Sequence, residues 1–536
     1  MCDMSSSTDP LLPAYQTAPE ISFSGSRSNR SEEIHYGATD VTPITTRKPK
    51  YGYNEVEAKV NLKGDVDLEG DAARTIEDGM AQFFRTIFGV IFFIIVVAVF
   101  ASMLKARTEP LDGPWPPVSV NRSAEQQVEE ILSTTPLIDG HNDLAIFIRS
   151  RYKNDIYTKQ FTHDFEQGGM PLNVDLPRLR NGSVGGAFWS AFVACPANAS
   201  YDMSDENYVT AAAHTIEQID LLRNLQEQYS HEFATCGGTP GSSSREHMFA
   251  EWRSNKSFFS PISIEGLHQV LPSAPMSSLR SYFGLGVRMA TLTWNCHNAF
   301  ADAALVWNDF TTPPKVVNGI SRPNEGAVTK RGKAVVQEMN RMGMIVDISH
   351  TSYWTQKAIL QNVSQAPVVF SHSSAYALCP HPRNVRDDVL DLVPRSKSLV
   401  MVNFSPDFIS CTSSEDDAML SQVGEPHFTL PVFYEHNNTL HQVARHIKYI
   451  GDRIGYDYVG LGSDFDGMGE LTPRGLEGVD KFRDLLAELL RMGVTFEDVK
   501  KITGTNILRV WAEVDRVSVQ LKKGGLQPAL DDAFGF

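Results

Sequence analysis

Eight short apolar runs alternate with longer stretches of helical periodicity between about residues 123 and 530. The runs cover residues 137–139, 186–195, 260–264, 287–293, 344–348, 368–370, 399–404 and 459–463. Between them, apolar residues recur with helical spacing, most clearly over residues 211–228, 326–341, 442–454 and 478–492. Strands buried on both faces read as continuous apolar runs, and eight strand-then-helix units are typical of a closed parallel barrel. We therefore predict an α/β fold, a (β/α)8 TIM-like barrel over residues 123–530; an open doubly wound sheet is the alternative.

A further apolar run precedes the barrel. Residues 86–104 contain no charged side chain and lie between Arg85 and Lys105. At about 1.5 Å per residue, a helix of this length nearly spans the ~30 Å of bilayer hydrocarbon. A buried core helix is the alternative, but the run is apolar on every face and is followed by a Pro-rich segment, residues 109–117. We therefore predict a single N-terminal transmembrane helix.

The segments on either side of this helix differ in composition. Residues 1–85 are rich in Ser, Thr, Pro, Gly and charged residues, which predicts a disordered tail, and we expect residues 105–122 to form a stalk. The flanking Lys and Arg residues do not decide the orientation. Glycosylation acceptors of the form N-x-[ST] do favour one, because Asn29 precedes the span and seven follow it, namely Asn121, Asn181, Asn198, Asn255, Asn362, Asn403 and Asn437. We expect a cytosolic N-terminus and an extracellular barrel at the plasma membrane.

The composition of the chain excludes some classes of function and of fold. The 536-residue chain carries a formal net charge of −16, which argues against nucleic acid as a partner, since phosphate binding uses clustered Lys and Arg. Its 42% of hydrophobic residues can form a large core. Six cysteines are enough for two or three disulfides but too few for a disulfide scaffold.

Imidazole and carboxylate side chains follow five of the eight predicted strands. They are His141, Asp143, Glu265, His350, His372 and Asp464. Barrel enzymes place their working groups at the carboxyl ends of the strands, and zinc accepts both kinds of ligand. Each residue alone has an ordinary explanation, such as a surface histidine or an acidic turn, but together they predict a metal site. The chain contains no H-E-x-x-H motif, no P-loop and no intact G-x-G-x-x-G.

These residues lie in strings that resemble the membrane (renal-type) dipeptidases, a zinc-dependent branch of the amidohydrolase barrels. The strings are PLIDGHNDL, SIEGLH, LGVRMATLTWNC, MGMIVDISHTS, APVVFSHSSAYALC, PRNVRDDVL, LVMVNF and GLGSDFDG, in the order found in that family. The resemblance extends from about Gln126 to Trp511 and implies hydrolysis of dipeptides by a binuclear-zinc metallopeptidase on the cell surface. The predicted N-terminal anchor differs from the lipid anchor common among vertebrate relatives.

The resemblance also implies a role for individual residues. His141 and Asp143 match the ligands of a first zinc ion, His350 and His372 those of a second, and Glu265 the carboxylate that bridges both. Asp464 matches the acidic residue that handles the proton of the bridging water, so that Glu265 and Asp464 are the expected catalytic carboxylates. Arg383, in PRNV, matches the group that holds the terminal carboxylate of the substrate.

The family pattern further implies two disulfides and a homodimer. Cys195 and Cys296 match one bridge, and Cys379 and Cys411 match another. Cys236 is left over, either free or joining two chains, so the expected homodimer is either disulfide-linked or non-covalent.

One position departs from the family pattern. A histidine that helps to stabilise the tetrahedral oxyanion usually follows the L-T of the fourth strand, and here Trp294 takes its place. An indole donates one N–H but cannot carry a proton charge, and losing one oxyanion donor typically costs ~10²–10³ in turnover. His297 is the candidate substitute in the substrate site. A weakly catalytic or non-catalytic relative, serving as a binding or adhesion ectodomain, is therefore the alternative function.

Overall fold

The computed structural model describes residues 122–235, 244–306, 315–316, 327–412 and 430–531. The predicted tail, the predicted transmembrane helix and nearly all of the predicted stalk lie outside these residues, as does Cys236. Among the helices of the described ranges, none combines the length and the apolar character that crossing a membrane requires.

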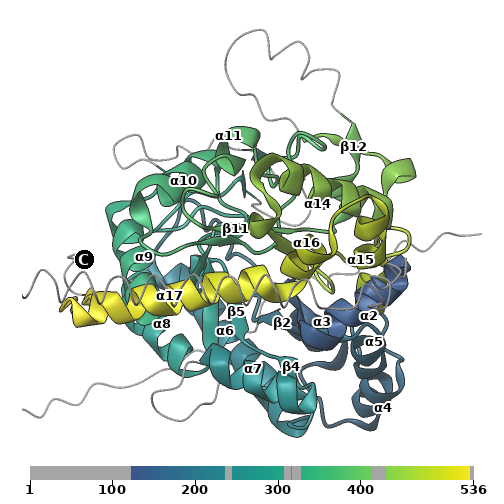
Figure 1. The fold of residues 1–536 in the computed structure, drawn as a ribbon. Helices are drawn as coiled ribbons and strands as arrows, with labels where there is room; N and C mark the ends of the chain where they lie inside the picture. The colour runs from purple at the N-terminus through teal and green to yellow at the C-terminus, as the bar shows by residue number, and fades with distance from the viewer. Residues whose placement is uncertain (1–121, 236–243, 307–314, 317–326, 413–429, 532–536) are drawn as a thin grey trace, which may run out of the picture. The chain divides into compact units, whose positions relative to one another are not determined.

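Eight parallel strands close into a barrel, drawn in Figure 1. They are β1 (Leu137–Asn142), β2 (Val184–Ser190), β5 (Ile262–Glu265), β6 (Val287–Thr291), β9 (Ile345–Asp347), β10 (Val369–Phe370), β11 (Leu399–Val402) and β14 (Val459–Leu461). Each strand pairs with the next one in this order, and β1 pairs in parallel with both β14 and β2, which closes the ring. The eight predicted strands and the closed barrel are confirmed, and the open sheet is wrong.

Helices cover the barrel and follow most of its strands. The longer ones are α2 (Ala124–Thr134), α3 (Leu144–Tyr152), α4 (Lys159–Gln167), α6 (Asp205–Gln228), α7 (Ser244–Asn255), α8 (Pro275–Gly284), α9 (Lys330–Met342), α14 (Leu440–Ile454), α15 (Phe482–Arg491) and α17 (Asn506–Lys523). The shorter ones are α5 (Leu176–Asn181), α10 (Tyr353–Ala358), α11 (Asp387–Leu390), α12 (Pro406–Ile409) and α16 (Phe496–Lys500). The four predicted helices correspond to α6, α9, α14 and α15, and side-chain caps set the true starts of the first three. Ser204, for example, accepts a hydrogen bond from the N–H of Asn207 and so starts α6 ahead of its apolar stripe.

Short strand pairs lie outside the barrel. β4 (Phe258–Phe259) pairs with β2, and β3 (Phe233–Ala234) pairs with β4. Two antiparallel pairs join β7 (Leu305–Val306) to β8 (Lys315–Val316) and β12 (Cys411–Thr412) to β13 (Val432–Phe433).

Alternating strand residues divide the core into an inner and an outer cluster. The inner cluster contains the first residues of three strands, Ile345, Val369 and Leu399, together with Trp511 of α17. The residues that follow them in each strand belong to the outer cluster beneath the helices. Trp511 is buried, and its ring centroid lies 5.4 Å from that of Phe188 inside the barrel. Helix α17 therefore closes the amino end of the barrel (Figure 1), and the opposite end is left for the site.

Candidate active site

The five predicted metal ligands converge at the carboxyl ends of four strands. His141 lies near the end of β1, Asp143 directly follows that strand, and Glu265 ends β5. The Nε2 atom of His141 lies 3.3 Å from Asp143 Oδ2 and 3.5 Å from Glu265 Oε2. These three residues form one buried group whose ligand atoms lie within 4.8 Å of one another.

The second group shares Glu265 with the first. Its other oxygen, Oε1, lies 2.9 Å from His350 Nε2 and 3.4 Å from His372 Nε2. The two imidazole Nε2 atoms are themselves 2.9 Å apart. Glu265 therefore presents one carboxylate oxygen to each group, which is the arrangement of a bridging ligand.

Asp464 lies beside these groups. A ligand atom of Asp464 lies within 4.8 Å of ligand atoms of His141 and His372. Asn403 Nδ2 donates a hydrogen bond to Asp464 Oδ2 over 3.0 Å. The close packing here depends on Gly467, because a Cβ at that position would collide with the carboxylates of Asp143 and Asp464. Asp464 is thus held at the edge of the cluster, with one of its carboxylate oxygens hydrogen-bonded to Asn403.

Burial and like charge make the cluster electrostatically costly without a cation. Burial, with the nearby charges of Asp143 and Asp464, raises the pKa of Glu265 to about 8. Burial also raises the pKa of Asp464 to about 6. Burial alone would lower the pKa of His141, but the charges of Glu265 and Asp143 raise it well above its usual value. These carboxylates therefore favour bound protons or a bound cation.

Two orphaned atoms show that the donor set fits a metal. Asp143 Oδ1 and His141 Nδ1 are buried and have no hydrogen-bond partner. Burial lowers the pKa of His350 and of His372 well below the ordinary value, so both rings are neutral ligands at neutral pH. Imidazole nitrogens and carboxylate oxygens are ligands that zinc accepts. The residues present therefore fit divalent metal ions of this kind.

The structure adds supporting residues that sequence reasoning missed. Ser371 Oγ lies 2.6 Å from Asp347 Oδ2 and 2.8 Å from His372 Nδ1. Asn295 Oδ1 lies 3.0 Å from His350 Nδ1. These residues orient the ligands, as hydrogen-bonded neighbours commonly do around metals. The only sequence signal was their place near a candidate residue: Asp347 lies three residues before His350, Ser371 directly precedes His372, and Asn295 directly follows Trp294.

Arg383 lies close to His372 with its hydrogen-bonding capacity largely unused. The side chain is 2% exposed, yet its Nε has no partner. Its Nη atoms make only long contacts, 3.5 Å to Ser373 Oγ and 3.4 Å to the His372 carbonyl oxygen. Burial lowers the pKa of Arg383 to about 10, so it remains charged at neutral pH. A buried guanidinium with free donors can bind an anion.

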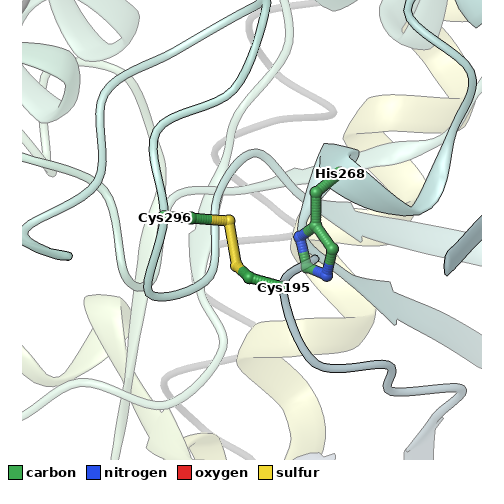
Figure 2. Close-up of side chains that lie close together, drawn as sticks. All are labelled: Cys195, His268 and Cys296. Carbon is green, nitrogen blue, oxygen red and sulfur yellow. A yellow bond between two sulfur atoms is a disulfide. The ribbon is translucent and has the colours of Figure 1, made fainter. Parts of the chain in front are cut away.

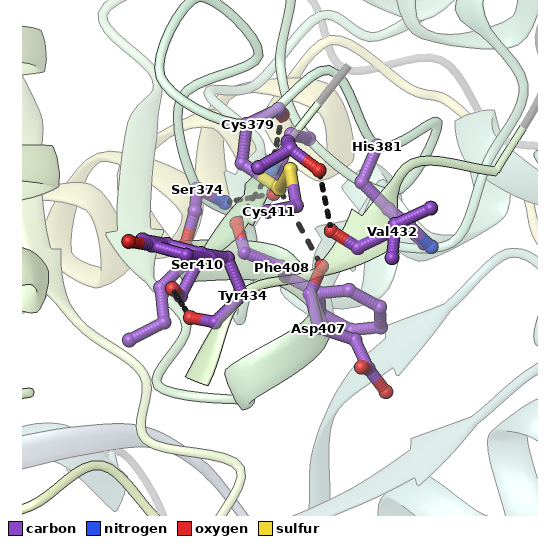
Figure 3. The surroundings of a disulfide bond; sticks show 12 residues. Ser374, Cys379, His381, Asp407, Phe408, Ser410, Cys411, Val432 and Tyr434 are labelled. Carbon is purple, nitrogen blue, oxygen red and sulfur yellow. Dashed lines mark hydrogen bonds between the residues drawn. A yellow bond between two sulfur atoms is a disulfide. The ribbon is translucent and has the colours of Figure 1, made fainter. Parts of the chain in front are cut away.

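The Cys379–Cys411 disulfide is present and lies beside the support of Arg383 (Figure 3). Phe408 of α12 lies beneath the guanidinium, with 5.2 Å between the Arg383 Cζ atom and the ring centroid. Asn384 Nδ2 donates to the carbonyl oxygens of both Cys379 and Phe408, over 2.9 and 2.7 Å. The disulfide and these hydrogen bonds therefore hold α12 against the arginine.

The predicted Cys195–Cys296 disulfide is also present, and it ties the segment after β2 to Cys296, which lies between the remaining candidates Trp294 and His297. Trp294 is half-buried, and its ring centroid lies 6.3 Å from that of His350. The Nδ1 atom of His297 accepts a hydrogen bond from the N–H of Ala303 over 3.0 Å. Trp294 thus borders the metal ligands, and the substrate role of His297 stays a prediction.

One family model and several curated proteins are similar to this chain over most of the described residues. The family model "Membrane dipeptidase (Peptidase family M19)" matches residues 125–524. Dipeptidase aclJ of Aspergillus oryzae is 41% identical over 394 residues, covering 74% of this chain and 82% of the relative. Dipeptidase verJ of Clonostachys rogersoniana is 38% identical over 397 residues, covering 74% of this chain and 88% of the relative.

Solved structures share the fold. One is a metallo peptidase from Rhodobacter sphaeroides, liganded with a phosphinate mimic of the dipeptide L-Ala-D-Ala, with a TM-score of 0.53 and 21% identity over 71% of this chain and 99% of that one. Another is the probable dipeptidase PvdM from Pseudomonas aeruginosa, with a TM-score of 0.56 and 20% identity over 74% of this chain and 99% of that one.

Proposed function

The chain belongs to the membrane dipeptidase family, peptidase family M19, and from that premise we propose that it is a binuclear-zinc dipeptidase of the cell surface. Hydrolysis of dipeptides by a metallopeptidase follows from the family. The observation that carries the two-zinc assignment is Glu265, whose two oxygens face different histidine groups. His141 and Asp143 would hold one ion and His350 and His372 the other.

Proton transfer falls to a side chain of the protein, beside the chemistry that the metal ions would supply. When bound, the two zinc ions would lower the pKa of a shared water and polarise the scissile carbonyl. Asp464, fixed by Asn403, accepts the proton of the attacking water and passes it to the leaving amine. Burial of the cluster keeps bulk water from screening these charges.

Arg383 selects short substrates with a free carboxyl terminus. Its unused Nε and weakly engaged Nη donors can bind a carboxylate in a bidentate manner. Arg383 lies against the carbonyl of the ligand His372, so a carboxylate bound there sits close to the metal ligands. A substrate held in this way has little chain between its terminus and the scissile bond, as a dipeptide does.

The intact site favours catalysis over a purely adhesive role, and Trp294 favours slow turnover. The ligand set, Asp464 and Arg383 are all in place around one centre. The indole at position 294 replaces an imidazole that could carry charge, so the oxyanion is less stabilised. We propose a dipeptidase with reduced turnover.

The membrane placement rests on sequence and on exposed glycosylation acceptors. Residues 86–104 would anchor the chain, with the N-terminus cytosolic and the barrel outside. Acceptor side chains are exposed at Asn181, Asn198, Asn255, Asn362 and Asn437. Asn403 is wrong as an acceptor, because it is fully buried and bonded to Asp464. Protease treatment of intact cells should remove the barrel, and a glycosidase should reduce its apparent mass; a barrel protected inside the cell contradicts this orientation.

Metal analysis with a dipeptide assay tests the central proposal. The purified full-length protein should contain two zinc ions per chain and hydrolyse dipeptides. One ion or none per chain in an active enzyme contradicts the binuclear site. The same preparation should behave as a homodimer, and its mobility on non-reducing gels distinguishes a Cys236-linked dimer from a non-covalent one.

A further inference from the structure

A third cluster of metal-ligating side chains lies outside the site described above. It consists of the Cys195–Cys296 disulfide and His268, whose ligand atoms lie within 4.8 Å of one another. Figure 2 shows the imidazole beside the disulfide, with one ring nitrogen turned toward the sulfur atoms. The cysteines come from segments that follow β2 and β6, and His268 follows β5.

His268 has the form of a prepared ligand. It is fully buried, and its Nε2 faces the Val193 carbonyl oxygen over 2.7 Å. A carbonyl only accepts, so Nε2 carries the proton and Nδ1 carries a lone pair. That Nδ1 is buried without a hydrogen-bond partner. Burial lowers the pKa of His268 to about 4, so the ring is neutral at neutral pH. Histidine ligands of metals commonly donate their second N–H to a backbone carbonyl in this way.

We propose that reduction of the Cys195–Cys296 disulfide converts this cluster into a zinc site, in which the two thiolates and His268 Nδ1 bind one Zn²⁺ ion. A dithiol or phosphine reductant supplies the two electrons that break the S–S bond, and two protons give two thiols. Zinc then displaces those two protons. Tetrahedral zinc with two sulfur ligands and one nitrogen ligand places them roughly 3.5–4 Å apart, which small side-chain movements can reach here.

Zinc would preserve a cross-link that supports the active site. The disulfide joins the segment after β2 to Cys296, and the neighbouring residue Asn295 holds His350 Nδ1. Cleavage of the S–S bond alone would remove the covalent link and leave the two segments joined by non-covalent contacts, such as the hydrogen bond from the N–H of His297 to Ser200 Oγ over 3.0 Å. A zinc ion bound to both thiolates and to His268 would keep the two segments together. The disulfide and the zinc ion are therefore interchangeable cross-links, selected by the redox state.

The test measures zinc uptake by the full-length holoenzyme before and after reduction by a phosphine. The protein is reduced in the presence of zinc, freed of excess metal by gel filtration, and analysed for zinc per chain. We expect one additional ion after reduction of the unaltered protein. His268→Gln, which keeps a donor for Val193, should bind this ion at least ~10-fold more weakly. No additional ion, or equal uptake by His268→Gln, overturns the proposal.

Two cysteine variants identify the thiols. Cys195→Ser/Cys296→Ser should gain no ion on reduction, whereas Cys379→Ser/Cys411→Ser should gain one as the unaltered protein does. Cobalt in place of zinc adds a spectroscopic readout, because thiolate ligation gives a charge-transfer absorption. That absorption should appear on reduction and be absent from the Cys195→Ser/Cys296→Ser variant; its presence there overturns the proposal. If either double variant fails to fold, the His268→Gln comparison still decides the question.

Discussion

The Nε2 atoms of His350 and His372 lie 2.9 Å apart and both carry lone pairs. Asn295 Oδ1 can only accept, so the Nδ1 of His350 holds that ring's proton. Ser371 Oγ uses its own hydrogen on Asp347 Oδ2, so it accepts from the Nδ1–H of His372. The lone pairs of the two Nε2 atoms repel each other at this distance, and a cation bound by both nitrogen atoms and by Glu265 would remove that repulsion. The hydrogen bonds of the surrounding side chains thus prepare the metal site.

Ser371→Ala should weaken zinc binding by ~10–100-fold, because it removes the acceptor that fixes the tautomer of His372. Competition with a chelator measures this affinity. Ser398→Ala is the matched control, since Ser398 is equally buried but accepts a hydrogen bond from Val368 at the other end of the strands. The control should lose stability without losing zinc affinity. Equal affinity losses in both variants would show that Ser371 has no specific role.

The sequence predicts the barrel and its ligands for a geometric reason. Parallel strands buried on both faces give continuous apolar runs, and all their carboxyl ends open on one side, so residues after different strands must meet. The hydrogen bonds between side chains that support these ligands produce no comparable pattern in the sequence. Asp347, Ser371 and Asn295 are ordinary polar residues until the fold places them behind a ligand. Asn403 shows the reverse case, because its sequon suggests a surface that the fold buries.

Arg383→Lys should raise the KM for dipeptides by ~10–100-fold, because an ammonium cannot form two parallel hydrogen bonds to a carboxylate. Dipeptide amides, which lack that carboxylate, should be hydrolysed slowly and equally by both proteins. Arg386→Lys is the control, since Arg386 stacks on Tyr353 and Tyr376 instead. A normal KM for Arg383→Lys would remove the arginine from substrate binding.

Asp464→Asn should keep its zinc content and lose at least ~10² in kcat, since an amide cannot transfer the proton. Metal analysis and steady-state kinetics on the same sample test both parts. Asp466→Asn serves as the comparison, because this buried neighbour mainly holds the backbone of Asn173. An Asp464→Asn enzyme with unchanged kcat would contradict the assigned role.

Trp294→His should raise kcat by up to ~10², since it supplies a donor that can carry charge near His350. Phe192→Leu is the control, because it disturbs the ring that packs on Trp294, 4.9 Å between centroids, without adding a donor. A rise in kcat in both variants would show that the shape of the pocket, and not the added donor, changes kcat. A kcat that stays the same or falls in Trp294→His would show that the indole does not limit catalysis.

His446 should make the folded protein less stable in mild acid. The residue is buried; its Nδ1 accepts from the Ala375 N–H, and its Nε2 donates to the Ile409 carbonyl oxygen. Burial lowers its pKa to about 4, whereas an unfolded histidine has a pKa of about 6.5.

Between those values the unfolded chain binds more protons than the folded chain, so stability is complete above about pH 6.5 and falls as the pH drops toward 4. From pH 7.5 to 5 this one residue should cost ~2 kcal/mol of unfolding free energy. His446→Gln should be less stable at pH 7.5 but should lose ~2 kcal/mol less over that interval, as measured by urea unfolding at both pH values. Because the metal ligands are the same in both proteins, their own titration cancels in this difference. Equal losses in the two proteins would mean that His446 does not titrate as its burial requires.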